Sequence, residues 1–390
     1  MALKVLTLNV WGLHIFAKRI RERLHYISQE LEGYDIVGLQ EVWSQDDYLF
    51  LVERLRRILP YSFRSKSGMI GSGLCVFSRY PIMAVHSQQF TTSGALRELT
   101  SGEVFSGKGM LSCRIMTPNG PLLFVTTHTN GCCRESQMYE MTKLIDNYRG
   151  NDLVVLCGDF NTGDTHPAYR LITTYLGLKD AFAGCSVNTC NLGSNIYTKR
   201  VRPARIDFIF YSSDTCPTSQ MEVQSKRLAL SGNIPGKDFP YSDHEGLEVV
   251  FSLNERVEPM PPRSLLLSVA AVEVLEEVAQ RICNRKKKFE APHPHRRAMA
   301  IAGGFLAVIL LIALILGNNP VMMFLGTRSL GYFSVVGVGI LGMCLMWAWL
   351  IPMFNITHVN GMETHMDEIR TRLSYNTILA ESDGNGYRLM

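Results

Sequence analysis

The sequence predicts a mixed α/β domain over residues 1–253, followed by two hydrophobic segments near the C-terminus. Short apolar runs rich in Val, Ile, Leu and Phe are typical of buried strands. Amphipathic helical patterns lie between some of these runs. Mixed strands and helices over such a length favour a sandwich in which sheets and helices form separate layers. A third observation, the absence of charged residues from 298–317 and 330–354, predicts membrane-spanning segments.

Six runs are expected to be strands and two longer stretches helices. In the stretch 16–30, Ile20, Leu24 and Ile27 share one helical face, and 46–59 repeats that spacing. The expected strands cover residues 4–9, 36–40, 74–77, 122–127, 153–157 and 206–211.

The chain divides into four parts. Residues 1–253 form the expected catalytic domain, and 254–297 form a linker and a juxtamembrane helix. The linker contains EPMPP at 258–262, which is stiff and extended. The stretch 265–282 has an amphipathic pattern in which Leu266, Val269, Val272 and Val278 are apolar. This helix is expected either to pack on the catalytic domain or to lie on a bilayer, and the sequence leaves both open.

Residues 298–354 are expected to form a transmembrane hairpin. Each uncharged run is about long enough to cross the roughly 30 Å of hydrocarbon in a bilayer, and two such runs together exceed ordinary core helices. Trp347 and Trp349 lie near the end of the second run, where interfacial anchors occur. Basic residues at 285–288 and 296–297 precede the first run, whereas Arg328 is the single charge between the runs. The positive-inside rule therefore places both termini, including the tail 355–390, in the cytosol.

Composition argues against two classes of function. The net charge of +4 is small, and the first 253 residues contain no long Lys/Arg run, so no nucleic-acid partner is expected. The ten cysteines show no spacing that suits a zinc site. Reduced thiols in a cytosolic domain are the simpler interpretation.

Polar residues recur at or just after the expected strands, where a rigid sheet can hold functional groups. Taken singly, each has an ordinary explanation, such as an Asx turn at Asp159 and Asn161. Their combination and order carry the signal. The residues are Asn9 in NVWGL, Glu41 in LQEVW, His128 in TTHTN, Asp159 and Asn161 in CGDFN, Asp207 in RIDFIF, and Asp243 and His244 in YSDHEGL.

This order of motifs resembles the endonuclease/exonuclease/phosphatase superfamily over about residues 3–253, with GDFN and SDH as the most specific parts. The resemblance implies a four-layered α/β sandwich. Within the superfamily the sequence is most similar to the neutral sphingomyelinases, through FSGKGML, RIDFIFY and GKDFPYSDHEGL. The two hydrophobic runs are similar to those of the smaller mammalian type, so the resemblance supports the transmembrane hairpin.

The resemblance implies a Mg²⁺-dependent site. Glu41 is the expected metal ligand, with Asn9 beside it, because Mg²⁺ prefers oxygen ligands. Asp159 and Asn161 are expected to position the nucleophile and the phosphate. Asp243 is expected to support the metal or the neighbouring histidine.

The same resemblance assigns the proton transfers. His244 is the expected general base, since imidazole titrates near physiological pH. Asp207 would orient it and stabilise its charge. His128 would act on the leaving-group oxygen or on the transition state.

Two positions bear on regulation and recognition. Thr129 and Asn130 follow His128, where the family usually shows Leu-His, so leaving-group recognition can differ. Glu103 lies five residues before Lys108, where the family carries an Asp–Lys pair that resembles an active-site switch. Lys108 is therefore a candidate site residue, and a surface salt bridge is the alternative interpretation.

The expected activity is the hydrolysis of sphingomyelin to ceramide and phosphocholine at a membrane surface, in the endoplasmic reticulum. A phospholipase C acting on lysophospholipids or ceramide phosphoethanolamine is the first alternative. A membrane-tethered nuclease or phosphoinositide phosphatase is a second, and a basic track for phosphates would favour the nuclease. A catalytically dead membrane scaffold is a third, although a scaffold has no need of Glu41, Asp159 and His244 together.

Overall fold

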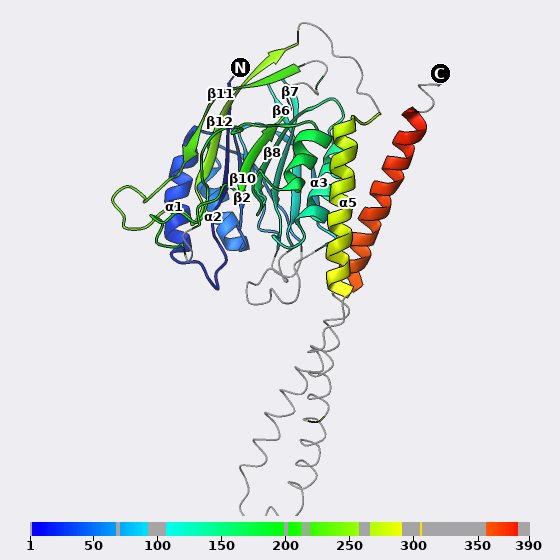
Figure 1. Cartoon of the computed structure of the whole chain (residues 1–390). Coiled ribbons are helices and arrows are strands. Elements are labelled where there is room, and N and C mark those ends of the chain that lie inside the picture. The colour runs from blue at the N-terminus through cyan, green and yellow to red at the C-terminus, as the bar shows by residue number, and fades with distance from the viewer. Residues whose placement is uncertain are drawn as a thin grey trace, which may run out of the picture. The chain divides into compact units, whose positions relative to one another are not determined.

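The computed structural model describes residues 2–67, 71–92, 107–198, 202–212, 216, 219–256, 266–290, 305 and 356–380. Two six-stranded sheets form the centre of the first domain (Figure 1). In the first sheet β1 pairs in parallel with β2, and the remaining neighbours pair antiparallel. Its strands, in spatial order, are β11 (Ser219–Ala229), β12 (Gly246–Glu255), β1 (Ala2–Asn9), β2 (Ile36–Gln40), β4 (Cys75–Ser78) and β3 (Tyr61–Arg64).

The second sheet repeats this plan around a parallel pair, β7 and β8. The other neighbours are again antiparallel. Each parallel pair needs a crossover, which a helix supplies between its two strands. The strands are β5 (Ile82–Gln89), β6 (Gly109–Thr117), β7 (Gly120–His128), β8 (Leu153–Asp159), β10 (Asp207–Tyr211) and β9 (Lys179–Asp180).

The helices α1 (Ile20–Glu30) and α2 (Gln45–Leu55) pack against the first sheet. Leu24 and Leu51 are buried there in one cluster with Val37 and Leu39. The helix α3 (Arg134–Tyr148) joins β7 to β8 and lies beside the second sheet (Figure 1). The arrangement is therefore helix, sheet, sheet and helix, as the four-layered sandwich requires. Three short helices complete this part of the chain: η1 (Leu31–Gly33), α4 (Pro167–Arg170) and η4 (Leu171–Tyr175).

The core lies between the two sheets, whose facing side chains are fully buried. Because both faces of the central strands are covered, their sequences are continuous apolar runs. One polar side chain crosses this core. Gln40, at the end of β2, donates from Nε2 to Thr7 Oγ1 at 3.0 Å and to Thr126 Oγ1 at 2.9 Å, so it links the two sheets.

Most of the predicted elements agree with the structure, with displaced boundaries. The helix expected over 16–30 begins only at Ile20, because Arg19 has a left-handed backbone with φ 51°. Phe16 lies in the preceding loop and is 44% exposed. The helix expected over 46–59 ends at Leu55.

The helix α5 (Val269–Glu290) replaces the one expected over 265–282. Of its apolar residues, Val278 is buried, whereas Val269 is 76% exposed. Arg170 of α4 pairs with Glu277, and Leu267 N donates to Asn376 Oδ1 at 2.6 Å. The first contact joins α5 to the catalytic domain, and the second joins the segment before α5 to the C-terminal helix.

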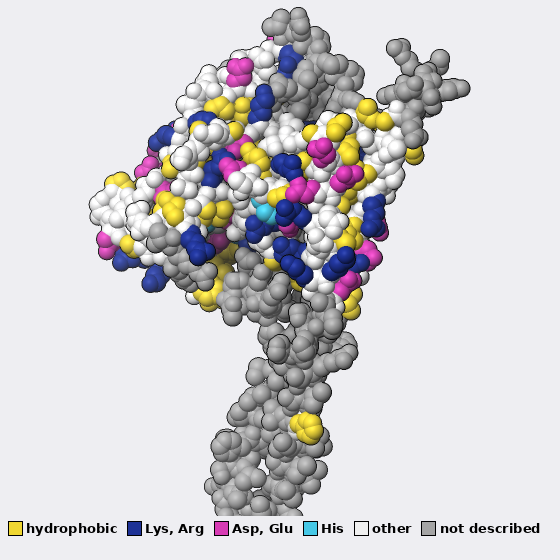
Figure 2. All heavy atoms as spheres, in the orientation of Figure 1, with side chains coloured by type: hydrophobic (Ala, Val, Ile, Leu, Met, Phe, Trp, Pro, Cys, Tyr) yellow, Lys and Arg dark blue, Asp and Glu magenta, His cyan; other side chains and the backbone are white. Residues whose placement is uncertain are grey.

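None of the helices within the described ranges is both long and apolar enough to cross a membrane. Apart from position 305, the expected spans 298–317 and 330–354 lie outside those ranges. The tail contains a helix over 356–380, and its residues 364–380 belong to the same compact unit as the described residues up to Ile282. On the face shown in Figure 2, basic and acidic side chains of the described residues are interspersed.

Candidate active site

The topology brings the predicted site residues to one end of the two sheets. In the first sheet Asn9 and Gln40 end the parallel strands β1 and β2 and pair in register, and Glu41 follows directly. In the second sheet His128 and Asp159 end β7 and β8 in register. Asp207, which begins the antiparallel strand β10, pairs with Asp159. His244 completes the group just before β12, the antiparallel neighbour of β1.

Asn9 lies at the centre of this end. Its Nδ2 donates to Glu41 Oε1 at 3.0 Å and to Asp159 Oδ2 at 3.0 Å. Its Oδ1 accepts from the backbone N of Trp11 at 2.9 Å. Asn9 thus joins the expected metal ligand of one sheet to the expected phosphate-positioning carboxylate of the other. The predicted role of Asn9 and Glu41 as metal ligands stays a prediction.

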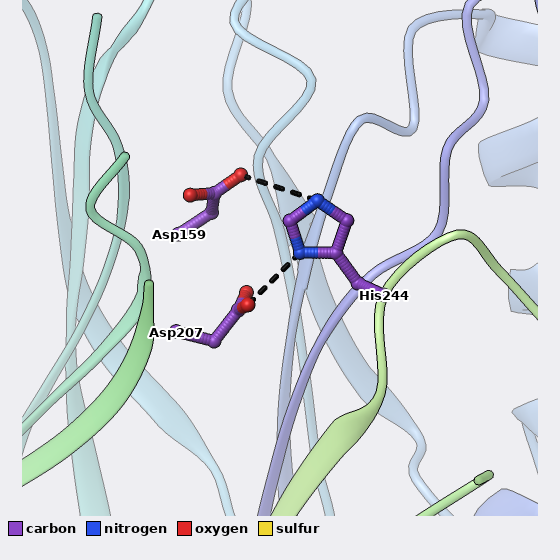
Figure 3. A group of neighbouring side chains, drawn as sticks. All are labelled: Asp159, Asp207 and His244. Atoms are coloured by element: carbon purple, nitrogen blue, oxygen red, sulfur yellow. Dashed lines mark hydrogen bonds and ion pairs between the residues drawn. The ribbon is translucent and has the colours of Figure 1, made fainter. Parts of the chain in front are cut away.

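His244 is held between two carboxylates (Figure 3). Its Nδ1 lies 2.9 Å from Asp207 Oδ2, and its Nε2 lies 3.9 Å from Asp159 Oδ2. The backbone N of His244 donates to Ser242 Oγ at 3.3 Å. The predicted pairing of His244 with Asp207 is therefore present, with Asp207 on the ring nitrogen opposite the one that faces the site.

The pKa values of the two histidines are shifted in opposite directions. Burial by itself lowers the pKa of His244, but Asp207 and then Asp159 raise it well above its ordinary value. Burial lowers the pKa of His128 well below its ordinary value, and Lys108 lowers it further. These shifts favour the neutral form of His128 and the protonated form of His244.

Asp159 connects these histidines. Its Oδ2 lies 3.4 Å from His128 Nε2, and its Oδ1 accepts from the backbone N of Asn161 at 2.9 Å. Burial, followed by the neighbouring charge of Asp207, raises the pKa of Asp159 to about 7. The carboxylate is thus poorly stabilised by the described side chains alone.

The segment after His128 is part of the site. Thr129 O accepts from Asn161 Nδ2 at 2.9 Å and from Lys108 Nζ at 3.3 Å. Lys108 is buried, and Asn130 N donates to Gln137 Oε1 at 2.7 Å. Thr129 and Asn130, which replace the family's Leu-His pair, therefore lie in a loop that is itself held by hydrogen bonds. The Thr129 carbonyl of this loop in turn holds the side chains of Lys108 and Asn161. The other member of the expected switch, Glu103, lies outside the described residues.

The donors present suit a divalent cation with oxygen ligands. Asp159, Asp207 and His244 offer atoms that all lie within 4.8 Å of one another. Asp207 Oδ1 is buried and finds no hydrogen-bond partner among the described residues. Burial raises the pKa of Asp243 to about 6, and the charge of Glu41 contributes to that rise. Crowded carboxylates with free lone pairs are the surroundings that Mg²⁺ requires, so the residues fit the predicted cofactor.

Unusual backbone conformations concentrate at the site. Trp11, Glu41 and Asn161 have positive φ values of 49°, 65° and 47°. Such conformations cost free energy and are retained where the surroundings enforce them. Gly158 in the CGDFN motif has φ 138°, and a Cβ there would lie 2.1 Å from Thr127 O. These conformations turn each strand end into the site.

Sequence reasoning missed three residues that support the site. Ser242 donates to Asn9 O at 2.6 Å and so ties the His244 segment to β1. Thr189 Oγ1 accepts from the backbone N of Asp207 at 3.2 Å. Arg23 contacts the backbone on both sides of the site. Ser242 stood inside the YSDHEGL motif, but nothing in the sequence marked Thr189 or Arg23.

Comparisons with known proteins agree with this geometry. The sequence matches the endonuclease/exonuclease/phosphatase family over residues 6–244. It is 32% identical over 299 residues to a protein of Caenorhabditis elegans that is provisionally named neutral sphingomyelinase, covering 65% of this chain and 67% of that protein. It is 30% identical to sphingomyelin phosphodiesterase 2 of Mus musculus, covering 63% and 64%. It is 27% identical to an inositol phosphosphingolipids phospholipase C of Schizosaccharomyces pombe, covering 70% and 73%.

The fold is also similar to that of solved structures. Beta toxin from Staphylococcus aureus aligns with a TM-score of 0.51 at 20% identity, covering 63% of this chain and 99% of that one. A beta toxin variant with bound magnesium ions aligns with a TM-score of 0.50 at 17% identity, covering 64% and 99%. These likenesses concern the two-sheet α/β fold.

Proposed function

The chain belongs to the endonuclease/exonuclease/phosphatase family, and on this premise we propose that it is a sphingomyelin phosphodiesterase, which hydrolyses sphingomyelin to ceramide and phosphocholine with Mg²⁺ at a membrane surface. The relatives named as neutral sphingomyelinase and sphingomyelin phosphodiesterase 2 support the substrate class. The observation that carries the chemistry is the position of His244 between Asp207 and Asp159.

In the proposed reaction His244 accepts a proton from the attacking water. The Nδ1–H of His244 donates a hydrogen bond to Asp207, so the unprotonated Nε2 can accept the proton of the water. The buried carboxylate of Asp207 then stabilises the imidazolium that forms. His244 must be neutral at the start, whereas the surrounding carboxylates raise its pKa.

A cation held near these carboxylates would resolve this conflict. Positive charge beside Glu41 and Asp243 would offset the field that favours protonated His244 and would lower the pKa of His244. Glu41 would hold the ion, with Asn9 orienting the Glu41 carboxylate. Bound Mg²⁺ would also neutralise charge that develops on the phosphate oxygens.

The leaving group belongs on the His128 side. His128 is buried and neutral, so it can donate a hydrogen bond to an oxyanion without a proton transfer beforehand. Lys108 and Asn161 are both anchored on Thr129 O beside it. A lysine and an amide held in this way suit contacts with phosphate oxygens.

A different sphingolipid headgroup is the second candidate. The relative named inositol phosphosphingolipids phospholipase C favours an inositol phosphate headgroup over phosphocholine. Both substrates are phosphodiesters of ceramide, so the catalytic groups are equally suited to either. The first 253 residues contain no long Lys/Arg run, which argues against a nuclease.

A panel of substrates tests the proposal. The full chain, purified in mixed detergent micelles with Mg²⁺, is offered sphingomyelin, ceramide phosphoethanolamine, lysophosphatidylcholine, an inositol phosphosphingolipid and plasmid DNA. Sphingomyelin should react fastest, EDTA should abolish turnover and Mg²⁺ should restore it. His86→Ala, on the edge strand β5, serves as the matched control for His244→Ala. Faster cleavage of the inositol lipid would favour the second candidate function over the first. Faster cleavage of DNA would exclude both candidates.

We propose in addition that residues 298–354 form a membrane hairpin and that the catalytic domain faces the cytosol, in the endoplasmic reticulum. The support is the uncharged composition of 298–317 and 330–354 and the basic residues that precede them. Protease added to sealed microsomes should digest the catalytic domain and the tail. Protection of the catalytic domain would contradict this orientation.

A further inference from the structure

Arg23 is a fully buried cation that serves the backbone. It extends from α1 and is 0% exposed. Its guanidinium donates to four carbonyl oxygens: Nε to Lys18 at 2.9 Å, Nη1 to Val10 at 2.6 Å and Tyr241 at 2.9 Å, and Nη2 to Trp11 at 2.7 Å. Among the described residues, none of its hydrogen bonds goes to a carboxylate. A buried charge is costly unless its hydrogen bonds are satisfied, so an arginine here requires a specific benefit.

Three of the four carbonyls belong to the segments that carry site residues. Val10 and Trp11 follow Asn9 directly, and Tyr241 lies three residues before His244. These two segments come from β1 and from the approach to β12. Arg23 therefore joins two active-site segments through its hydrogen bonds. A second link between them is the hydrogen bond from Ser242 Oγ to Asn9 O.

The contact with Trp11 reaches the reacting groups through one further residue. Trp11 has a left-handed backbone with φ 49°, and Arg23 holds its carbonyl in that conformation. In this conformation the Trp11 N–H donates to Asn9 Oδ1, which turns Asn9 Nδ2 toward Glu41 and Asp159. The guanidinium also lies 5.3 Å from the centre of the Trp11 ring, within the range of a cation–π contact.

We propose that Arg23 is a positioning residue for the phosphodiesterase reaction, which fixes the orientation of the Asn9 amide and the register of the segment that ends at His244. The inference rests on the proposed function for the identity of the reaction. Arginine is required because only its planar group reaches several carbonyls at fixed angles, whereas a lysine ammonium is a compact point charge. Arg23 touches neither substrate nor metal in this assignment.

Arg23→Lys in the full chain tests the proposal. It keeps the charge but loses the fork of donors, so kcat on sphingomyelin should fall by about 10- to 100-fold, the scale of a misplacement of reacting groups near 1 Å. KM should stay within about threefold, because Arg23 touches no substrate in this assignment. Arg149→Lys is the matched control: Arg149 is also buried and donates to Leu176 O at 3.0 Å, at the far end of α3.

A second readout is independent of substrate. The rise in melting temperature on titrating Mg²⁺ reports its apparent affinity, and Arg23→Lys should weaken that affinity several-fold while Arg149→Lys leaves it unchanged. Full kcat and full Mg²⁺ affinity in a folded Arg23→Lys protein would overturn the proposal. If that variant does not fold, Arg23→Gln, which buries no charge, takes its place. Failure of both to fold would assign Arg23 to folding alone.

The two hypotheses fail separately. A wild-type chain that does not cleave sphingomyelin removes the proposed function. Two ratios of variant to wild type decide the role of Arg23. One is the ratio of kcat on whichever phosphodiester is cleaved, and the other is the ratio of Mg²⁺ affinities.

Discussion

Asp207→Asn removes one charge from the pair with His244 and leaves the shape of the side chain unchanged. The hydrogen bond between His244 Nδ1 and Asp207 Oδ2 is 2.9 Å long, and both side chains are largely buried. A hydrogen bond to a charged group contributes about 1.5–3 kcal/mol. At about 1.4 kcal/mol for each factor of ten, its loss in the transition state lowers kcat by roughly 10- to 150-fold.

His244→Ala removes the base itself and should lower kcat by about 10²–10⁴-fold. Because Asp207 acts through His244, the double variant should be about as slow as His244→Ala alone. Single-turnover kinetics on sphingomyelin in mixed micelles measure the chemical step directly. Asp152→Asn is the control, since Asp152 pairs with Arg114 at 2.6 Å beside the opposite end of β8 and should affect stability but not kcat.

Multiplication of the two losses in the double variant would refute this pairing. Asp207 would then act independently, for instance by holding a cation through its Oδ1. Near-full activity of a folded His244→Ala protein would refute the mechanism as a whole.

Three further outcomes are expected. Glu41→Gln should weaken Mg²⁺ by about tenfold or more, since it removes the ligand charge; a thermal-shift titration measures this, and unchanged affinity would move the ion to Asp159 and Asp207. Asn161→Ala should lower kcat, because it frees Thr129 O from one of its two donors; kcat equal to wild type would exclude a role in catalysis. Burial lowers the pKa of His365 to about 4, so the unfolded chain binds more protons between pH 6.5 and 4. Stability is therefore full above pH 6.5 and should fall by roughly 3 kcal/mol toward pH 4. Melting curves at several pH values check this, and an identical slope in His365→Gln would contradict it.

The strands were predictable because the sandwich covers both faces of its central strands. The run 153–157 is apolar throughout, and the run 36–40 is apolar up to Gln40, whose amide is hydrogen-bonded inside the core. Glu41 and Asp159 are therefore visible in the sequence as the first carboxylates at strand ends. Their motifs predict functional groups at strand ends, and the pairing of the strands brings these ends together.

The supporting residues could not be predicted for a physical reason. Arg23 lies in a stretch of polar helix residues, IRERLHYISQE, where an arginine ordinarily faces solvent. Its burial depends on carbonyls from residue 241, which are close only in the folded chain. The sequence predicts only that the tail 355–390 is cytosolic. In the structure Glu368 pairs with Lys143 of α3 at 2.7 Å, across 225 positions of sequence.

The site depends on two sheets that share no backbone hydrogen bond ladder. Asn9 and Glu41 come from the first sheet, and Asp159 comes from the second, so the contact between Asn9 and Asp159 measures how the sheets sit against each other. Gln40 fixes that arrangement one residue below Glu41, through hydrogen bonds to Thr7 and Thr126 within an apolar core. A buried amide forms its hydrogen bonds only within a narrow range of distances, whereas packed methyl groups tolerate a wider range. The spacing between Glu41 and Asp159 therefore depends on hydrogen bonds within the core as well as on contacts at the site.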